Sequence, residues 1–250
     1  KPQTLLDSKL DEREFVVRFV TRVNREIGGA YVFSCGKNMG VFKAVGYPED
    51  VGEFYRLEEY EGYAWTAHGR YPTNTPGWWG GAHPFSILDY SVVHNGEISS
   101  YDANRRFIEM YGYNCSLLTD TEVITYIIDF LVRRKGLTLE EAAGVIAAPF
   151  WSTIEQMPEA QRERLAYLRE TFASLLITGP FSILLGFTGG MMALNDRLKL
   201  RSMVCAEKGE AVYFASEECA IRVMEPDVET LWAPRGGQAV VVRLNDGVTV

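Results

Sequence analysis

The sequence contains no long hydrophobic run and no excess of positive charge. The apolar stretch LLITGPFSILLGF is interrupted by Gly179 and Pro180, so no segment approaches the roughly 20 apolar residues of a membrane span. The start, KPQTLLDSKLDERE, is polar and lacks the hydrophobic centre of a signal peptide. We therefore expect a protein that is neither embedded in a membrane nor exported.

The net charge and the cysteines argue against two further classes, nucleic-acid-binding and disulfide-rich proteins. A net charge of -8 disfavours a nucleic-acid-binding surface, because phosphate binding requires clustered Lys and Arg. The four cysteines show neither CxxC spacing nor the density of a disulfide framework: Cys35, Cys115, Cys205 and Cys219. Free thiols in a reducing cytoplasm are the expectation.

What is present fits a layered α+β domain. Hydrophobic residues make up 47% of the 250 residues, which is enough for one large core. Helical periodicity predicts helices near 11–26, 51–59, 100–110, 119–136, 137–148 and 160–176, with a break or flexible loop at 149–158. Short apolar runs predict strands at 30–34, 40–47, 63–70 and 89–98, and antiparallel sheet through the C-terminal third. Strands at both ends with helices between them indicate two stacked sheets covered by helices.

Candidate functional residues concentrate between His68 and Glu122. HGRYPTNTPGWWGGAHPF is followed by VVHNGEIS and then by TDTEVI, and all three histidines of the chain fall in this window. Loops that combine Arg, His, Asn, Trp and Gly carry binding sites more often than regular elements do.

Together the three segments resemble the glutamine-binding half of a class II, N-terminal-nucleophile glutamine amidotransferase. The variant HGRYPTNT…AHP…HNGEIS is most similar to the amidotransferase domain of glutamate synthase. ALNDRLKLRSM and AVYFASEECAI resemble two later segments of the family, although Lys199 and Ser202 replace its Gly and Pro. The resemblance implies one domain over 1–250 with the four-layer αββα sandwich of N-terminal-nucleophile hydrolases, whose two sheets are mostly antiparallel.

The resemblance assigns a binding residue to each of the two charged groups of a glutamine molecule. Arg70, supported by Thr73, would bind the α-carboxylate, since a bidentate Arg suits that group. Asp120 would hold the α-ammonium. Taken alone, Arg70 could be a surface arginine, and TDTE could be a capping box in which Asp120 only complements the helix dipole.

Asn95 and Gly96 occupy the family's oxyanion position. There the Asn95 amide and the Gly96 N–H would face the developing negative charge of the tetrahedral intermediate. An Asn-Gly pair between apolar residues is also the strongest short signal of a tight hairpin, and that alternative stays open at the level of sequence.

The segment 72–84 is expected to close over a small ligand, because glycines flank Trp78 and Trp79. Packing of both tryptophans against the sheet is the alternative. The resemblance implies that Tyr71, Asn74 and His83 also line the pocket. We interpret His68 and His94 as structural histidines.

The nucleophile of the family, an N-terminal cysteine, does not occur in this sequence, which begins at Lys1. A lysine cannot supply a thiol, and Cys35 lacks the free α-amino group that serves as the base. We interpret Cys35 as a small core thiol. The favoured expectation is that a leading segment with the cysteine and a first strand precedes Lys1, and the alternative is that the nucleophile has been lost.

The favoured function is hydrolysis of L-glutamine to glutamate and ammonia, with the ammonia passed to a synthase partner on another polypeptide and with no cofactor. The alternative is a catalytically inactive glutamine-binding subunit of the same fold. A metal site of His68, His83 and His94 is disfavoured by their spacing, so no metal is expected.

Overall fold

The computed structural model describes residues 10–71, 77–244 and 247–249, and its centre is a six-stranded sheet in which all neighbouring strands are antiparallel. The strand order is β1-β2-β3-β4-β8-β9. The strands are β1 (Phe85–Ile87), β2 (Tyr90–Gly96), β3 (Phe181–Phe187), β4 (Gly190–Asn195), β8 (Val240–Arg243) and β9 (Gly247–Thr249).

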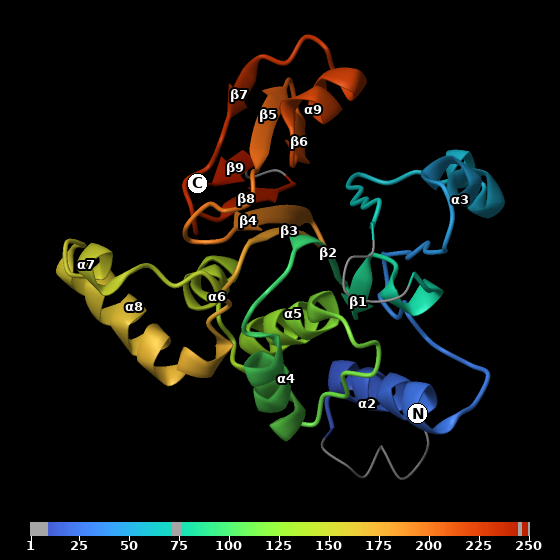
Figure 1. The fold of residues 1–250 in the computed structure, drawn as a ribbon, viewed down its shortest axis with the longest axis horizontal. Helices are drawn as coiled ribbons and strands as arrows, with labels where there is room; N and C mark the ends of the chain where they lie inside the picture. The colour runs from blue at the N-terminus through green and yellow to red at the C-terminus, as the bar shows by residue number, and fades with distance from the viewer. Residues whose placement is uncertain (1–9, 72–76, 245–246, 250) are drawn as a thin grey trace.

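A second, three-stranded sheet packs beside the β3–β4–β8 part of the first (Figure 1). It contains β5 (Val204–Lys208), β6 (Ala211–Ala215) and β7 (Thr230–Trp232), in the order β6-β5-β7. Ala193 and Val240 of the large sheet form a buried cluster with Cys205 of the small one. The helix α9 (Glu218–Met224) contacts β6, so the chain has the layer order helix–sheet–sheet–helix that the sequence predicted.

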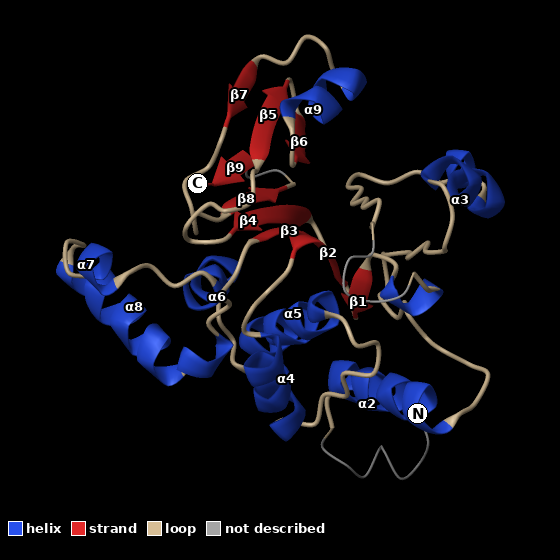
Figure 2. Cartoon of the chain, in the orientation of Figure 1, coloured by secondary structure: helices blue, strands red, loops and turns tan. Residues whose placement is uncertain are grey.

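Helices cover the opposite face of the large sheet, and α5 (Asp120–Asp129) contacts β1 and β2 (Figure 2). Val123, Ile124 and Ile127 of α5 are fully buried, and they form the apolar face that packs against the core. The helix continues as a π-turn, Phe130–Arg134. Around it lie α2 (Glu12–Glu26), α4 (Tyr101–Met110), α6 (Leu139–Ile146) and α8 (Glu159–Thr171).

Three predicted strands are absent from the structure. The segments 30–34, 40–47 and 63–70 are irregular. In the first of them, side chains make hydrogen bonds that a main-chain ladder would make in a strand. The Asn24 amide pairs with both main-chain polar groups of Val32, and the Ser86 hydroxyl donates to the Phe33 carbonyl. The Thr66 hydroxyl lies 3.4 Å from that of Ser91.

The helix predictions are correct in position and wrong in some details. The apolar spacing of α2 predicts a buried face of Phe15, Val16, Phe19, Val20 and Val23. Of these, Val16 packs against the core and Phe19 is exposed, whereas Val17 is the buried residue of the helix. Ser100 precedes α4, but its hydroxyl donates to the Asn104 side chain and does not cap the helix. The predicted break at 149–158 contains α7 (Trp151–Ile154), and the helix predicted at 51–59 is α3 (Pro48–Tyr55) followed by a 3-10 turn, Leu57–Glu59. Two further 3-10 turns occur at Trp79–Gly81 and Ala173–Leu175.

None of the helices in the described ranges is both long enough and apolar enough to cross a membrane.

Candidate active site

The end of β2 presents main-chain groups that β1 does not cover. β1 pairs with β2 only as far as Val92, and two residues later the His94 carbonyl accepts a hydrogen bond from His68 Nε2 at 2.8 Å. On the other edge, the Glu97 N–H donates to the Pro180 carbonyl. Because the two edges alternate along an antiparallel strand, the N–H of Gly96 turns away from β3, toward the side where β1 has already ended.

The hairpin interpretation of Asn95-Gly96 is wrong. Both residues lie inside β2 and pair with Ser182 and Phe181 of β3. Gly96 has a φ of +155°, and a Cβ at this position would lie 2.2 Å from the Pro180 carbonyl oxygen, so no other residue fits. Side chains alternate between the two faces of a strand, which puts Asn95 on the same face as Ser91 and His94 on the face toward α5.

Thr121 joins the three motif segments at one hydroxyl. Its Oγ1 lies 3.0 Å from His83 Nε2 and 3.3 Å from His94 Nδ1, and it donates to Asp120 Oδ1 at 3.3 Å. A hydroxyl has one proton and two lone pairs, so it can serve all three neighbours at once. The loop that carries His83, the strand that carries His94 and the first turn of α5 are therefore fixed against one another.

Asp120 is held in its ionised form at the start of α5. Burial acts to raise the pKa of this carboxyl group, but the hydrogen bond from His94 and those from the N–H groups of Ile98 and Thr121 outweigh burial and lower it. The Ile98 N–H donates to Asp120 Oδ2 at 3.2 Å, and His94 Nδ1 lies 3.4 Å from Oδ1. Asp120 therefore also anchors the chain just after Gly96, a role that the sequence did not predict.

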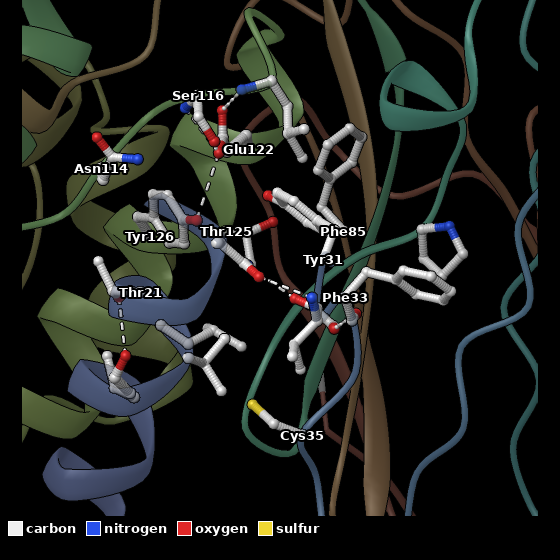
Figure 3. Close-up of a pocket in the computed structure, with 18 residues that line it drawn as sticks. Thr21, Tyr31, Phe33, Cys35, Phe85, Asn114, Ser116, Glu122, Thr125 and Tyr126 are labelled. Carbon is white, nitrogen blue, oxygen red and sulfur yellow. Dashed lines mark hydrogen bonds between the residues drawn. The ribbon is translucent and has the colours of Figure 1, made fainter. Parts of the chain in front are cut away.

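The capping box predicted for TDTE is not formed. Thr119 does cap α5, and its side chain accepts from the N–H of Thr121. Glu122 instead accepts from the N–H groups of Ser116 and Leu117 (Figure 3). Burial raises the pKa of Glu122 to about 7, although these two N–H groups, Tyr126 and the charge of Lys43 act to lower it.

A hollow of about 970 Å³ lies on the Asn95 face of the sheet, and Arg70 is part of its wall. A Cβ on Gly81 would lie 2.9 Å from Arg70 Nη1, so the guanidinium fits closely against the backbone there. His68, His83 and Tyr71 line the same hollow, and Tyr71 is 89% exposed. The hollow is lined by Ser91, Gly186 and Phe187 of β2 and β3. Thr73 and Asn74 lie outside the described residues.

The three histidines come together as hydrogen-bonded groups. The rings of His68 and His83 are 4.3 Å apart. Burial, then the charges of His94 and Arg70, lower the pKa of His68 to about 4, and burial likewise lowers that of His83. One nitrogen of each ring is bonded to an oxygen atom. In the part of the chain that the structure describes, no three His, Cys, Asp or Glu side chains are placed to hold a metal ion.

Trp78 and Trp79 pack against neighbouring groups on the loop. Their rings lie 5.5 Å apart, and Trp79 also packs edge-on against Tyr31 at 5.2 Å. A Cβ on Gly80 would overlap the Trp78 ring at 2.5 Å, which explains a glycine there. Closure of this loop over a ligand stays a prediction.

Cys35, Cys115 and Cys205 are not activated thiols. Cys35 is half-buried beside α2, in a small cavity of about 50 Å³ that Glu122 and Tyr126 also line (Figure 3). Burial raises the pKa of Cys35, Cys115 and Cys205, which leaves little of the reactive thiolate near neutral pH. Cys35 is a core thiol, as predicted.

Comparison with known proteins decides the family. The family described as glutamine amidotransferases class-II matches residues 1–250. The chain belongs to the class II glutamine amidotransferases. The three motif segments that meet at Thr121 are thus parts of an amidotransferase domain, and the resemblance inferred from them is confirmed.

Relatives differ in how much longer they are. An uncharacterized protein of Archaeoglobus fulgidus is 50% identical over 95% of this chain, which spans 63% of that protein. The amidophosphoribosyltransferase of Methanocaldococcus jannaschii is 24% identical, over 80% of this chain and 37% of its own length. Among solved structures, the glutamine phosphoribosylpyrophosphate amidotransferase of B. subtilis aligns with a TM-score of 0.44 at 18% identity, over 64% of this chain and 28% of that one.

Two buried polar residues of the site were not found from the sequence. The sequence marks Thr121 only as part of TDTE, yet the three segments meet at its hydroxyl. Lys43 is 5% exposed and lines the hollow. A single lysine within the apolar run GVFKAVGY was the available signal, because a lysine is almost never fully buried without a partner.

Proposed function

We propose that this amidotransferase domain hydrolyses L-glutamine and passes the ammonia to a glutamate synthase-type partner on another polypeptide. The observation that supports the proposal most directly is the outward N–H of Gly96, next to the Asn95 side chain and beyond the end of β1. Such a donor is held by the sheet before any substrate arrives, which is what stabilisation of an oxyanion requires.

In this mechanism Arg70 binds the α-carboxylate of glutamine, with Thr73, and ionised Asp120 binds the α-ammonium. Tyr71, Asn74 and His83 complete the pocket wall. Arg70 fits against Gly81 and lines the hollow together with His83, and the Thr121 hydroxyl connects His83 to Asp120; these links support a site that the two charged residues share.

The proposed nucleophile is an N-terminal cysteine that would precede Lys1 in the full polypeptide. Its thiol adds to the amide carbon while its own α-amino group takes the thiol proton. The oxyanion then faces Asn95 and Gly96. Ammonia leaves with that proton, and water cleaves the thioester to give glutamate. The four cysteines that the structure leaves unpaired are consistent with a cytoplasmic location, which is part of the proposal.

The test is glutamate release from L-glutamine by the native protein, with its N-terminus first established by intact mass and N-terminal sequencing. We expect glutamate and ammonia in equal amounts, and faster release when the synthase partner is present. A preparation with an intact N-terminal cysteine that releases no glutamate, even with the partner, would refute the function.

The second candidate is a glutamine-binding subunit without catalysis. The raised pKa values of Cys35, Cys115 and Cys205 favour it if no N-terminal cysteine exists. It predicts a calorimetric signal for glutamine binding, no turnover, and no labelling by an alkylating glutamine analogue.

A further inference from the structure

Lys43 is a buried cation that the proposed mechanism does not use. Its side chain is enclosed by aromatic rings, with Nζ 4.3 Å from the centre of the Phe85 ring and 6.0 Å from that of Phe33. Within the described ranges, no carboxylate lies within ion-pair distance of Nζ. A buried charge without a counter-ion is costly, so its compensation must come from elsewhere.

That compensation comes from two carbonyl groups and a ring. Nζ donates to the Gly80 and Pro84 carbonyls, each at 3.4 Å. It also makes a cation–π contact with the face of the Phe85 ring. The two carbonyls stand on either side of the segment 81–83. Gly81 is the residue against which Arg70 fits, and His83 is the residue bonded to Thr121.

We propose that Lys43 is a positioning residue of the glutamine site, which clamps the backbone on both sides of His83 and thereby holds the Arg70 wall of the hollow in place. The inference rests on the proposed function, since it takes the hollow as the place where glutamine binds. In this proposal Lys43 acts through the backbone of Gly80 and Pro84.

The charge state of Lys43 agrees with this role. Burial lowers its pKa to about 8, against the opposite effect of the Glu122 charge from α5. Lys43 and Arg70 in turn both act to lower the pKa of His83. The lysine is therefore charged near neutral pH. Above about pH 8 the neutral amine has one N–H donor fewer and loses the electrostatic attraction to the Phe85 ring.

The test compares Lys43→Met and Lys43→Arg with Lys37→Met, which removes an exposed lysine of the same segment. Two quantities are measured: backbone hydrogen exchange over 78–85, and the KM and kcat for glutamine. The N–H groups of Gly81 and Ala82, which donate to Trp78 and Trp79, are the protected probes of this segment.

We expect Lys43→Met to speed exchange at 78–85 and to leave α5 unchanged. The KM should rise roughly tenfold to a hundredfold, the equivalent of one or two hydrogen bonds to a charged group, with a much smaller change in kcat. Lys43→Arg should recover part of both effects, and Lys37→Met should show neither. In the wild type, KM should rise as the pH passes about 8, and this rise should vanish in Lys43→Met.

Two outcomes would overturn the inference. One is a Lys43→Met protein with unchanged exchange and unchanged KM. The other is faster exchange in every segment, α5 included, which would make Lys43 an ordinary core residue; Lys43→Gln, a smaller and uncharged donor, repeats this check if methionine prevents folding. Failure of the wild type to use glutamine refutes the proposed function instead, and the exchange measurement still decides whether Lys43 holds 78–85.

Discussion

His83 Nε2 and the hydroxyl oxygen of Thr121 lie 3.0 Å apart, and this contact connects a loop to the first turn of a largely buried helix. The same hydroxyl is 3.3 Å from His94 Nδ1. One hydroxyl group therefore holds two imidazole rings that come from different parts of the segment between His68 and Glu122.

Replacement of Thr121 by Val keeps the shape and removes this hydroxyl. We expect a loss of about 1–3 kcal/mol in the free energy of unfolding, because buried ring nitrogens lose their partner. Thr125→Val is the matched control, since the Thr125 hydroxyl bonds only to the helix carbonyl of Thr121. Denaturant unfolding of both variants checks this, and equal losses in the two would show that the hydroxyl of Thr121 has no special role.

Asn95→Gly separates catalysis from strand geometry. The proposed oxyanion donor acts only as charge develops, so kcat should fall roughly 10²–10³-fold with KM nearly unchanged. Since Asn95 pairs with Ser182 inside a ladder, the variant should also lose about 0.5–1 kcal/mol of stability. Asn95→Ala restores most of that stability but not kcat. Steady-state assays of a protein with its N-terminal cysteine decide the matter, and full turnover by either variant excludes the amide as a donor.

Removal of the charge of either Arg70 or Asp120 should weaken glutamine binding. For Arg70→Ala and Asp120→Asn we expect a loss of about 2–5 kcal/mol in binding free energy, as for a charge left without its partner. Asparagine is chosen at 120 because this carboxylate also holds Ile98, and alanine would disturb the backbone. Calorimetric titration with glutamine is the measurement. Wild-type affinity in one variant removes that residue from the site.

Gly96→Ala should prevent stable folding of this region. The added Cβ would lie 2.2 Å from the Pro180 carbonyl and 2.8 Å from His94 Nε2, closer than any relaxed structure allows. Gly52→Ala, in α3 with open space around it, should be neutral or slightly stabilising, since alanine is the better helix former. Melting temperatures of the two variants compare them directly; a Gly96→Ala protein as stable as wild type would contradict the tight pairing of β2 with β3.

Acid should destabilise the protein through its histidines. The unfolded chain binds protons at His68 and His83 below about pH 6.5, whereas the folded chain holds His68 neutral down to about pH 4 and His83 lower still. Stability therefore falls as the pH drops through this window, by up to about 1.4 kcal/mol per pH unit for each histidine. Glu122 opposes this loss, because its folded pKa of about 7 exceeds the unfolded value of 4.5, so the folded state binds the extra proton.

The check is denaturant unfolding at pH 7, 6 and 5. His68→Asn should lower the number of protons taken up on unfolding by one, and so flatten the pH dependence of stability. Glu122→Gln should make that dependence steeper between pH 7 and 4.5. A Glu122→Gln variant whose stability varies with pH as the wild type does would show that Glu122 does not take up this proton.

Sequence patterns predicted the helices and the C-terminal sheet well, because those elements carry their own periodicity. The 3.6-residue spacing of α5 and the apolar runs of β3 and β4 need no information from elsewhere in the chain. The irregular segments 30–34 and 63–70 have the composition of strands, but composition does not say whether a partner strand is available. In the described structure, side chains such as Asn24 take the partner's place.

At the site, the sequence predicted which residues are polar and clustered but not how each one bonds. Glu122 matched the spacing of a capping box, yet its carboxylate reaches back to Ser116 and Leu117. Asn95-Gly96 matched a hairpin, yet β3, a distant segment, pairs with both residues. Local pattern cannot reveal a partner that comes from a later part of the chain.

The pairing of Gly96 with Phe181 has a consequence for synthesis. A ribosome that has made all the motif segments has not yet made β3, the strand that fixes Gly96 in place. The motif segments therefore cannot reach their final arrangement until β3 has been synthesised and the chain between β2 and β3 closes into a loop. Until then, His68, His94 and Asp120 are free to make other contacts. A fragment that ends before β3 would carry the three motif segments between His68 and Glu122 in full and still lack a formed site.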